Sequence, residues 1–472
     1  MNIKIPENFI LGAASSAWQT EGWQGKKEGQ DSFLDSWYKN EKFVWHNGYG
    51  PAVATNFMEK YPEDVALMKE IHLTHYRTSI NWARFFTDYE NLVVDEDYAQ
   101  HIDDVVDALL VAGVEPMLCL EHYEVPAYLL ETYDGWSAKK VVDLYVGYAR
   151  IAFERYGDRV KQWFTFNEPI VPQTRCYLDA IRWPHEQDTK KWMLWNYHKV
   201  LATAKAIEVY RAGGYDGRIG CILNPEMVYP RSSAKEDLHA AHIYDLFYNQ
   251  VYFGPMVLGE YPAELIALCQ EHEIYFDPTP AELAVIKANT CDFLGVNQYY
   301  PKRVKAPRYE WNKGTPFHPE MYYESFDLPG KQMNNSRGWE IYPEIMYDMA
   351  LYLKNNYGDI PWFVSENGMG RENEEEYLDE QGVVQDTYRI EFITKHLYQL
   401  LRAVEEGANC EGYMLWAFTD CVSPMNAFKN RYGLVRIELD TARTRKLKKS
   451  AAWYKELIDE RILEVADTKD YQ

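Results

Sequence analysis

Eight short apolar segments recur along the chain, and a longer segment of mixed polar and apolar residues follows each of them. Within the short segments the apolar residues run almost without interruption rather than alternating with polar ones. Uninterrupted hydrophobicity is typical of parallel strands whose two faces are both buried. The sequence therefore predicts eight strands, over residues 9–17, 74–80, 114–120, 160–166, 218–223, 291–297, 360–365 and 410–418.

The longer segments have the periodicity of helices. Between residues 138 and 157, apolar side chains recur three and four positions apart, and Gly157 marks the expected end. Eight strand-then-helix units predict an α/β fold, a single (β/α)₈ TIM barrel over residues 1–472. An open doubly wound sheet is the alternative, although no glycine-rich phosphate loop follows the first strand. We expect residues 301–340 to build over the barrel mouth and the acidic run 372–380 to be a solvated loop.

The net charge and the placement of the cysteines limit the classes of partner and the cellular compartment that we expect for this protein. A net charge of −23 argues against nucleic acid and anionic membranes, because both are bound through clusters of Lys and Arg. The N-terminus lacks a signal peptide's features, and no stretch nears the ~20 apolar residues that span a bilayer. Cys119, Cys291 and Cys410 lie in or beside strand-like runs, which favours reduced core thiols. We expect a cytoplasmic protein, and the sequence leaves its oligomeric state open, a homo-oligomer included.

The ends of the predicted strands carry polar and aromatic residues. In a barrel, the carboxyl ends of the strands face the active site. Aromatic residues make up 15% of the chain, and because aromatic faces stack well on sugar rings, this tilts the prediction toward carbohydrate. The strand-end residues are Gln19, Arg77, His122, Asn167, Glu168, Glu226, Asn297, Tyr299, Glu366 and Trp416.

Two of these residues form a catalytic pattern. Glu168 in "FTFNEP" and Glu366 in "FVSENG" each follow an apolar run directly. Glycosidic cleavage needs two carboxyl groups, one to protonate the leaving oxygen and one to attack the anomeric carbon or activate water. A single Glu at a strand end more often caps a helix or pairs with an Arg, but the pair favours catalysis.

Seven motifs in register resemble glycoside hydrolase family 1, the β-glucosidase family. They are "ILGAASSAWQTEG", "YRTSINW", "CLEHYEVP", "FNEP", "LGVNQYY", "SENG" and "GYMLWAFTD", which together cover residues 10 to about 440. The resemblance implies a single barrel and a retaining, two-step mechanism. By the family pattern Glu168 is the acid/base and Glu366 the nucleophile, with Arg77 and Tyr299 beside the nucleophile. Retention also implies a separation of ~5–5.5 Å between the two carboxyl groups.

The resemblance also implies which residues bind the sugar. Its members use the positions of Gln19, His122, Asn167, Asn297 and Trp416 to bind sugar hydroxyls and to stack the ring. Trp339 and Tyr300 are candidates for the aglycone site. The chain departs from the family pattern at Tyr123, where Trp is common, and at Gln298, where Tyr is usual, which affects substrate detail rather than catalysis.

The loop "DCVSPMNAFKNRYG" at residues 420–433 places basic and hydroxyl side chains in an acidic chain. Two interpretations are open: a salt-bridged turn, in which Lys429 and Arg431 balance nearby acids, or a pocket for an anion. Family members that act on 6-phospho-β-glycosides carry a Ser, a Lys and a Tyr in this loop. The resemblance therefore implies phosphate binding by Ser423, Lys429 and Tyr432, with Asn430 as the alternative to Lys429 because counting back from Tyr432 reaches Asn430.

The expected function is that of a 6-phospho-β-glucosidase whose partner is a small phosphorylated β-glucoside. A β-glucosidase for unphosphorylated sugars is the alternative, although members of that type carry Glu where this chain has Ser423. A 6-phospho-β-galactosidase is less favoured because Pro424 replaces the Trp that such enzymes tend to carry. A catalytically silent sugar-binding barrel is disfavoured because both carboxylates are present.

Other chemistries are poorly supported by the sequence. His239 and His242 are three positions apart but lack the Glu of a metalloprotease motif, so we expect surface histidines. There is no Gly-x-Ser-x-Gly elbow of a serine hydrolase. Nothing in the sequence calls for a metal or a cofactor.

Overall fold

A closed barrel of eight parallel strands forms the centre of the computed structural model, which describes residues 1–312 and 314–465. Each strand pairs with its neighbour in chain order, and the last strand pairs with the first. The strands are β2 (Ile10–Ala14), β3 (His75–Ser79), β6 (Glu115–Glu121), β7 (Gln162–Asn167), β8 (Arg218–Leu223), β10 (Leu294–Asn297), β15 (Trp362–Asn367) and β16 (Cys410–Trp416). All eight predicted strands and the barrel are confirmed. The single-domain prediction runs to residue 472 and so includes residues 466–472, which lie outside the described residues.

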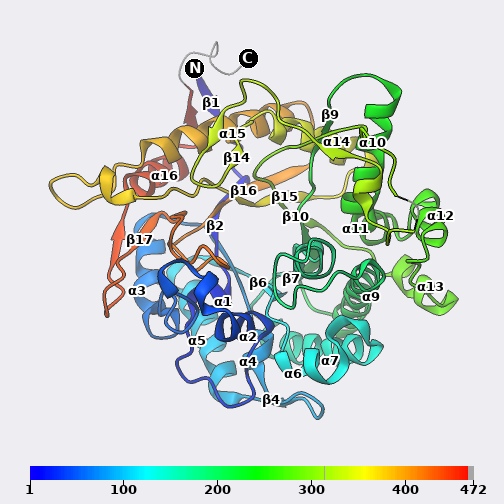
Figure 1. Ribbon diagram of the computed structural model, residues 1–472. Coiled ribbons are helices and arrows are strands. Elements are labelled where there is room, and N and C mark those ends of the chain that lie inside the picture. Colours follow the sequence, from blue (N-terminus) through cyan, green and yellow to red (C-terminus); the bar gives the residue numbers. More distant parts are fainter. Residues whose placement is uncertain (313, 466–472) are drawn as a thin grey trace.

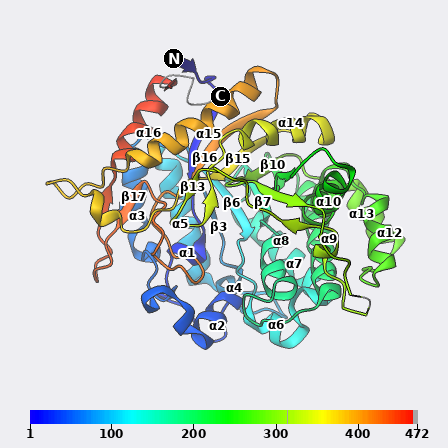
Figure 2. The same cartoon turned by 45° about the horizontal axis from the view of Figure 1, so that its top comes forward.

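Helices surround the barrel on its outside (Figures 1 and 2). The longer ones are α2 (Phe33–Asn40), α3 (Phe57–Glu70), α5 (Glu96–Ala112), α7 (Lys139–Tyr156), α9 (Thr189–Gly213), α10 (Lys235–Asp245), α12 (Ala263–Glu271), α13 (Pro280–Ala288), α14 (Ile345–Tyr357), α15 (Thr387–Glu405) and α16 (Lys449–Glu460). The predicted helix over 138–157 is α7, and its apolar residues Val141, Tyr145 and Tyr148 are fully buried. It ends at Gly157, as the pattern predicted. Local signals also set other ends: the Asp95 side chain caps α5, and Gly113 with a φ of 81° terminates it.

A layer of apolar side chains fills the inside of the barrel. It consists of Met117, Cys119, Phe164, Ile222, Phe293, Phe363 and Met414, all fully buried. Side chains alternate between the two faces of a strand, so the residues that point inward differ from those that pack on the helices. Because this layer closes the interior, a ligand can enter only where the strands end.

Short strands extend the chain beyond the barrel. The stretch 301–340 contains β11 (Lys302–Lys305), β12 (Glu324–Ser325), β13 (Met333–Asn334) and β14 (Trp339–Glu340), and β11 also pairs with β9 (Val228–Pro230). The remaining pairs join β4 (Phe86–Asp88) to β5 (Val93–Val94), β17 (Val435–Ile437) to β18 (Arg445–Leu447), and β1 (Asn2–Lys4) to β19 (Ile462–Glu464). The last pair joins residues 2–4 to residues 462–464.

The acidic run 372–380 is largely the solvated loop that the sequence predicts, since Asn373, Glu375, Glu376 and Glu380 are exposed. Glu374 differs: it is only 1% exposed and forms ion pairs with Arg389 and Lys448. These opposite charges, from α15 and from the chain before α16, offset the cost of burying its carboxylate. Two predictions about side chains agree with the structure: His239 and His242 are exposed on α10, and all seven cysteines are buried free thiols.

Candidate active site

A cavity of about 450 Å³ opens where the barrel strands end. Nine of the ten strand-end residues that the sequence singles out line it, and Arg77 lies fully buried beside it. Residues 301–340 contribute Arg337 and Trp339 to its wall, as expected for a segment that builds over the barrel mouth. The lining residues also include Tyr123, Gln298, Tyr300, Ser423 and Tyr432.

Glu366 lies near the end of β15 and accepts hydrogen bonds from two directions. The guanidinium of Arg77, from β3, donates to one carboxylate oxygen. The Tyr299 hydroxyl donates to the other oxygen at 2.8 Å. A cation and a hydroxyl that both donate to a carboxylate stabilise its ionised form, which is the form that can attack carbon.

Glu168 follows β7 directly and has a left-handed backbone, with a φ of 44°. This conformation directs its side chain into the cavity, where Tyr123 donates to Oε2 and Asn297 Nδ2 donates to Oε1 at 2.9 Å. Burial, followed by the negative charge of Glu366, raises the pKa of Glu168 to about 7. Glu168 is therefore able to hold a proton near neutral pH and also to release it.

A chain of polar contacts joins the strand ends beneath the two carboxylates. Arg77 Nη1 donates to His122 Nδ1 at 3.0 Å, and His122 Nε2 lies 3.3 Å from Asn167 Nδ2. Asn297 Nδ2 in turn donates to Asn167 Oδ1 at 3.1 Å. Burial and the Arg77 charge hold the pKa of His122 well below its usual range, so this histidine is neutral. The network fixes four polar side chains at the floor of the cavity.

Trp416 and Gln19 form another part of the wall. The Trp416 ring stacks on His122 with centroids 5.8 Å apart, and it is the last residue of β16. Gln19, in the short helix α1 (Ala17–Thr20), donates to the carbonyl of Val422 at 2.8 Å. This bond ties the end of the first barrel strand to the loop that follows the eighth.

The loop 420–433 divides its side chains between two environments. Ser423 and Tyr432 line the cavity, whereas Lys429 and Asn430 do not. The Lys429 ammonium lies 3.1 Å from a carboxylate oxygen of Glu372, and Asn430 is buried. Arg431 pairs with Asp420. The two basic residues of the loop thus form salt bridges, and its two hydroxyl residues line the cavity.

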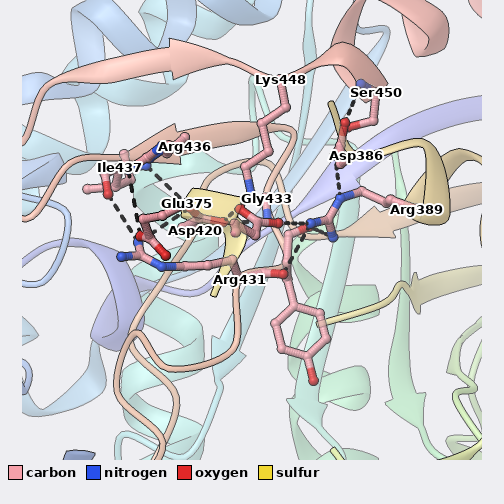
Figure 3. A network of polar contacts seen from close by, with 12 residues as sticks. Glu375, Asp386, Arg389, Asp420, Arg431, Gly433, Arg436, Ile437, Lys448 and Ser450 are labelled. Atoms are coloured by element: carbon pink, nitrogen blue, oxygen red, sulfur yellow. Dashed lines mark hydrogen bonds and ion pairs between the residues drawn. The ribbon is translucent and has the colours of Figure 1, made fainter. Parts of the chain in front are cut away.

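Buried charges hold this loop in place (Figure 3). Asp420 receives Lys448 Nζ at 2.9 Å and the backbone N–H of Gly433 at 2.9 Å. Arg389 pairs with Asp386 and donates to the carbonyl oxygen of Tyr432 at 2.9 Å. Because Asp420 and Arg389 both hydrogen-bond to the backbone of this loop, the network fixes the backbone that carries the Tyr432 side chain.

Two cavity residues, Tyr123 and Arg337, make contacts that the sequence motifs did not predict. Tyr123 was noted only as a departure from the family pattern, yet its hydroxyl donates to Glu168. Arg337 was not singled out, because it lies in the hairpin turn between β13 and β14, outside every strand-end motif. Its guanidinium stacks on the Trp339 ring at 4.3 Å, and the Arg-x-Trp spacing was the available signal.

The described residues, 1–312 and 314–465, contain no group of three or more His, Cys, Asp or Glu side chains placed to hold a metal ion. Within the same ranges no helix has both the length and the apolar character needed to cross a membrane.

Comparisons with known proteins agree with this geometry. A family model described as glycosyl hydrolase family 1 matches residues 1–462. The 6-phospho-beta-glucosidase GmuD of Bacillus subtilis is 42% identical over 97% of this chain and 98% of its own, and a 6-phospho-beta-galactosidase of Lacticaseibacillus casei is 31% identical over 98% and 100%. The rice Os3BGlu6 beta-glucosidase superimposes with a TM-score of 0.88 at 26% identity, over 96% of this chain and 98% of that one. The chain belongs to glycosyl hydrolase family 1.

Proposed function

We propose that this protein is a retaining glycoside hydrolase that cleaves 6-phospho-β-D-glucosides. The observation that carries the proposal is the pair of carboxyl groups that line one cavity in opposite electrostatic settings. Glu366 receives a cation and a hydroxyl, and Glu168 has a pKa raised to about 7. Divergent environments of this kind assign one carboxyl group as acid and the other as nucleophile.

In the first step, Glu366 attacks the anomeric carbon while Glu168 gives its proton to the leaving oxygen. The glycosidic C–O bond breaks, and a glycosyl ester forms on Glu366. In the second step, Glu168 takes a proton from water, which attacks the anomeric carbon and releases Glu366. Retention requires the two carboxyl groups to lie ~5–5.5 Å apart, so that the nucleophile reaches carbon directly.

The charge of Glu366 lets Glu168 act in both directions. That charge is the second cause of the raised pKa of Glu168, after burial. Once Glu366 is esterified it is neutral, so the pKa of Glu168 falls and the residue becomes a base for water. Arg77 and Tyr299, which bind the free carboxylate, then stabilise it again as it leaves.

The other cavity residues fit recognition of one sugar ring. Polar side chains that would bind its hydroxyls lie at the floor, and Trp416 offers a ring face for stacking. In this proposal the sugar-binding residues are Gln19, His122, Asn167, Asn297 and Trp416, with Trp339 on the aglycone side.

Phosphate specificity is supported by the loop after β16. Ser423 and Tyr432 present hydroxyl donors to the cavity, and no carboxylate of this loop lines it to repel an anion. The Bacillus subtilis relative is named a 6-phospho-beta-glucosidase. Phosphorylated disaccharides arise during import into bacterial cells, so this substrate also implies a cytoplasmic location.

One comparison of substrates tests the proposal. We expect kcat/KM for p-nitrophenyl β-D-glucoside 6-phosphate to exceed that for the unphosphorylated glucoside by at least about 100-fold, since two or three hydrogen bonds to a phosphate are lost in the latter. Comparable turnover of the two compounds would defeat the phosphate assignment and favour a β-glucosidase. Following the released sugar by NMR checks the stereochemistry: a first-formed α-anomer would rule out the retaining mechanism.

A further inference from the structure

Three arginines line the cavity, and they differ in their surroundings. Arg175 donates to Asp179 at 2.7 Å. Burial and then the positive charge of Arg175 lower the pKa of Arg182, and Tyr123 and Glu168, on the acid/base side, act on that pKa in the opposite direction. Arg337 lies beside Trp339 and forms no ion pair with any carboxylate in residues 1–312 and 314–465. Arg337 is therefore a cavity cation that no carboxylate of the described residues pairs with.

The position of Arg337 is set by its hairpin. The backbone N–H groups of Arg337 and Gly338 both bond to the Asn334 carbonyl, at 3.1 and 2.8 Å. The Asn334 side chain donates to the carbonyl of Gly370, in the loop after β15, at 3.0 Å. With its backbone fixed and its guanidinium resting on an indole 4.3 Å away, Arg337 keeps a defined orientation at little entropic cost on binding.

Arg337 lies on the same side of the cavity as the hydroxyl residues of the loop. Trp339, on which it stacks, packs with Tyr299 against the buried cluster that contains Trp416 and Tyr432. Burial raises the pKa of Tyr432 to about 12, and the charge of Arg337 is the largest influence in the opposite direction. Arg337 and Tyr432 line the same cavity, and Asn334 of the Arg337 hairpin bonds to Gly370, which lies against the Tyr432 ring.

The loop 420–433 presents no competing cation to the cavity. Lys429 pairs with Glu372, 3.1 Å away, and its side chain is 40% exposed and does not line the cavity. Arg431 forms an ion pair with Asp420, and Asn430 is neutral and buried. A phosphate bound by Ser423 and Tyr432 would thus lack a positive partner unless one came from another loop.

We propose that Arg337 is the cation that binds the substrate's 6-phosphate, together with Ser423 and Tyr432. The assignment rests on the proposed function and names a residue for it. A guanidinium can donate two parallel hydrogen bonds to two phosphate oxygens and stays charged at every working pH. The phosphate is then shared between the hairpin before β14 and the loop after β16, whereas a glucoside without phosphate makes no use of Arg337.

Arg337→Met, which keeps the side chain's length and removes its charge, tests the assignment. We expect kcat/KM for p-nitrophenyl β-D-glucoside 6-phosphate to fall about 10- to 100-fold, as for the loss of one hydrogen-bonded charge pair. Hydrolysis of the unphosphorylated glucoside should change less than threefold, and Arg337→Lys should restore part of the loss. Glucose 6-phosphate should inhibit the variant more weakly by a similar factor.

Two further variants give the comparison its controls. Arg150→Met places the same substitution at an exposed position outside the cavity and should alter neither substrate preference nor inhibition. Lys429→Met tests the alternative cation. A phosphate-selective loss in Lys429→Met but not in Arg337→Met would overturn the proposal, and so would an equal loss on both substrates in a folded Arg337→Met.

The wild-type protein separates this inference from the proposed function. If the wild type does not prefer the phosphorylated substrate, the proposed function fails, and the assignment of Arg337 falls with it. If the wild type prefers that substrate and Arg337→Met retains the preference, only the assignment of Arg337 is overturned. Thermal unfolding of each variant confirms that its fold is intact.

Discussion

The proton on Glu168 can be tested through Tyr123, whose hydroxyl donates to the carboxylate. This bond and the one from Asn297 favour the ionised form and lower the pKa of Glu168, which burial and Glu366 raise to about 7 overall. Tyr123→Phe removes one donor, so the pKa of Glu168 must rise. A hydrogen bond to a charged group contributes about 1.5 kcal/mol or more, which corresponds to about one pKa unit.

The shift predicts a defined change in the pH profile. With a pKa near 8 instead of 7, about half of Glu168 is protonated at pH 8, compared with about a tenth in the wild type. Activity at pH 8 relative to the maximum should therefore rise about fivefold. The assay is kcat/KM between pH 5.5 and 9.5 for a phenyl glucoside 6-phosphate, whose poor leaving group makes proton donation limiting.

A matched control isolates the carboxylate contact. Tyr300→Phe removes the hydroxyl of another cavity tyrosine, which makes no hydrogen bond with a carboxylate in the described part of the chain. The basic limb of the kcat/KM pH profile of Tyr300→Phe should match that of the wild type. A Tyr123→Phe profile whose basic limb is unmoved, or shifts to lower pH, would refute the view that this hydroxyl stabilises the ionised form of Glu168.

Three more predictions concern the nucleophile, the phosphate loop and stability. Glu366→Gln should lower kcat by about 10⁴-fold or more with the thermal midpoint retained, and substantial remaining turnover would mean that another residue attacks. Ser423→Glu should lower kcat/KM for the 6-phosphate about 100-fold while that for the plain glucoside holds, because a carboxylate there repels the anion. Burial lowers the pKa of His396 to about 4, so the folded state resists protonation below the unfolded value of about 6.5. Its stabilising contribution is complete above pH 6.5 and falls toward pH 4. Between pH 7.5 and 5, the unfolding free energy of the wild type should therefore fall by about 2 kcal/mol more than that of His396→Gln, as measured by urea denaturation.

The barrel could be predicted because each strand carries its own signal. Strands such as β8 and β10 are buried on both faces, so their inner residues, 219–223 and 294–296, contain no charged or amide side chain. The carboxyl ends of the barrel strands surround the cavity, which is why Glu168 and Glu366 could be identified together. Both inferences depend only on local sequence and on a rule of the fold.

The loops could not be predicted in the same way, because their contacts join distant parts of the chain. Lys429 and Glu372 are 57 positions apart, and nothing local to either indicates their pairing. Glu374 lies in an acidic run that suggests solvent, yet Lys448 and Arg389 bury it. Arg337 reaches the cavity only because a hairpin folds over the barrel mouth. Charge patterns along a sequence do not show which charges meet.

At position 168 the left-handed backbone makes the residue that catalysis needs unfavourable for the stability of the fold. Any residue with a Cβ atom reduces the stability of the folded state by about 1 kcal/mol or more in this conformation, whereas glycine adopts it freely. Replacement by glycine would also remove a carboxyl group that burial disfavours in its charged form. Laboratory evolution that selects only for heat tolerance would therefore enrich inactive barrels altered at residue 168, and turnover has to be part of the selection from the first round.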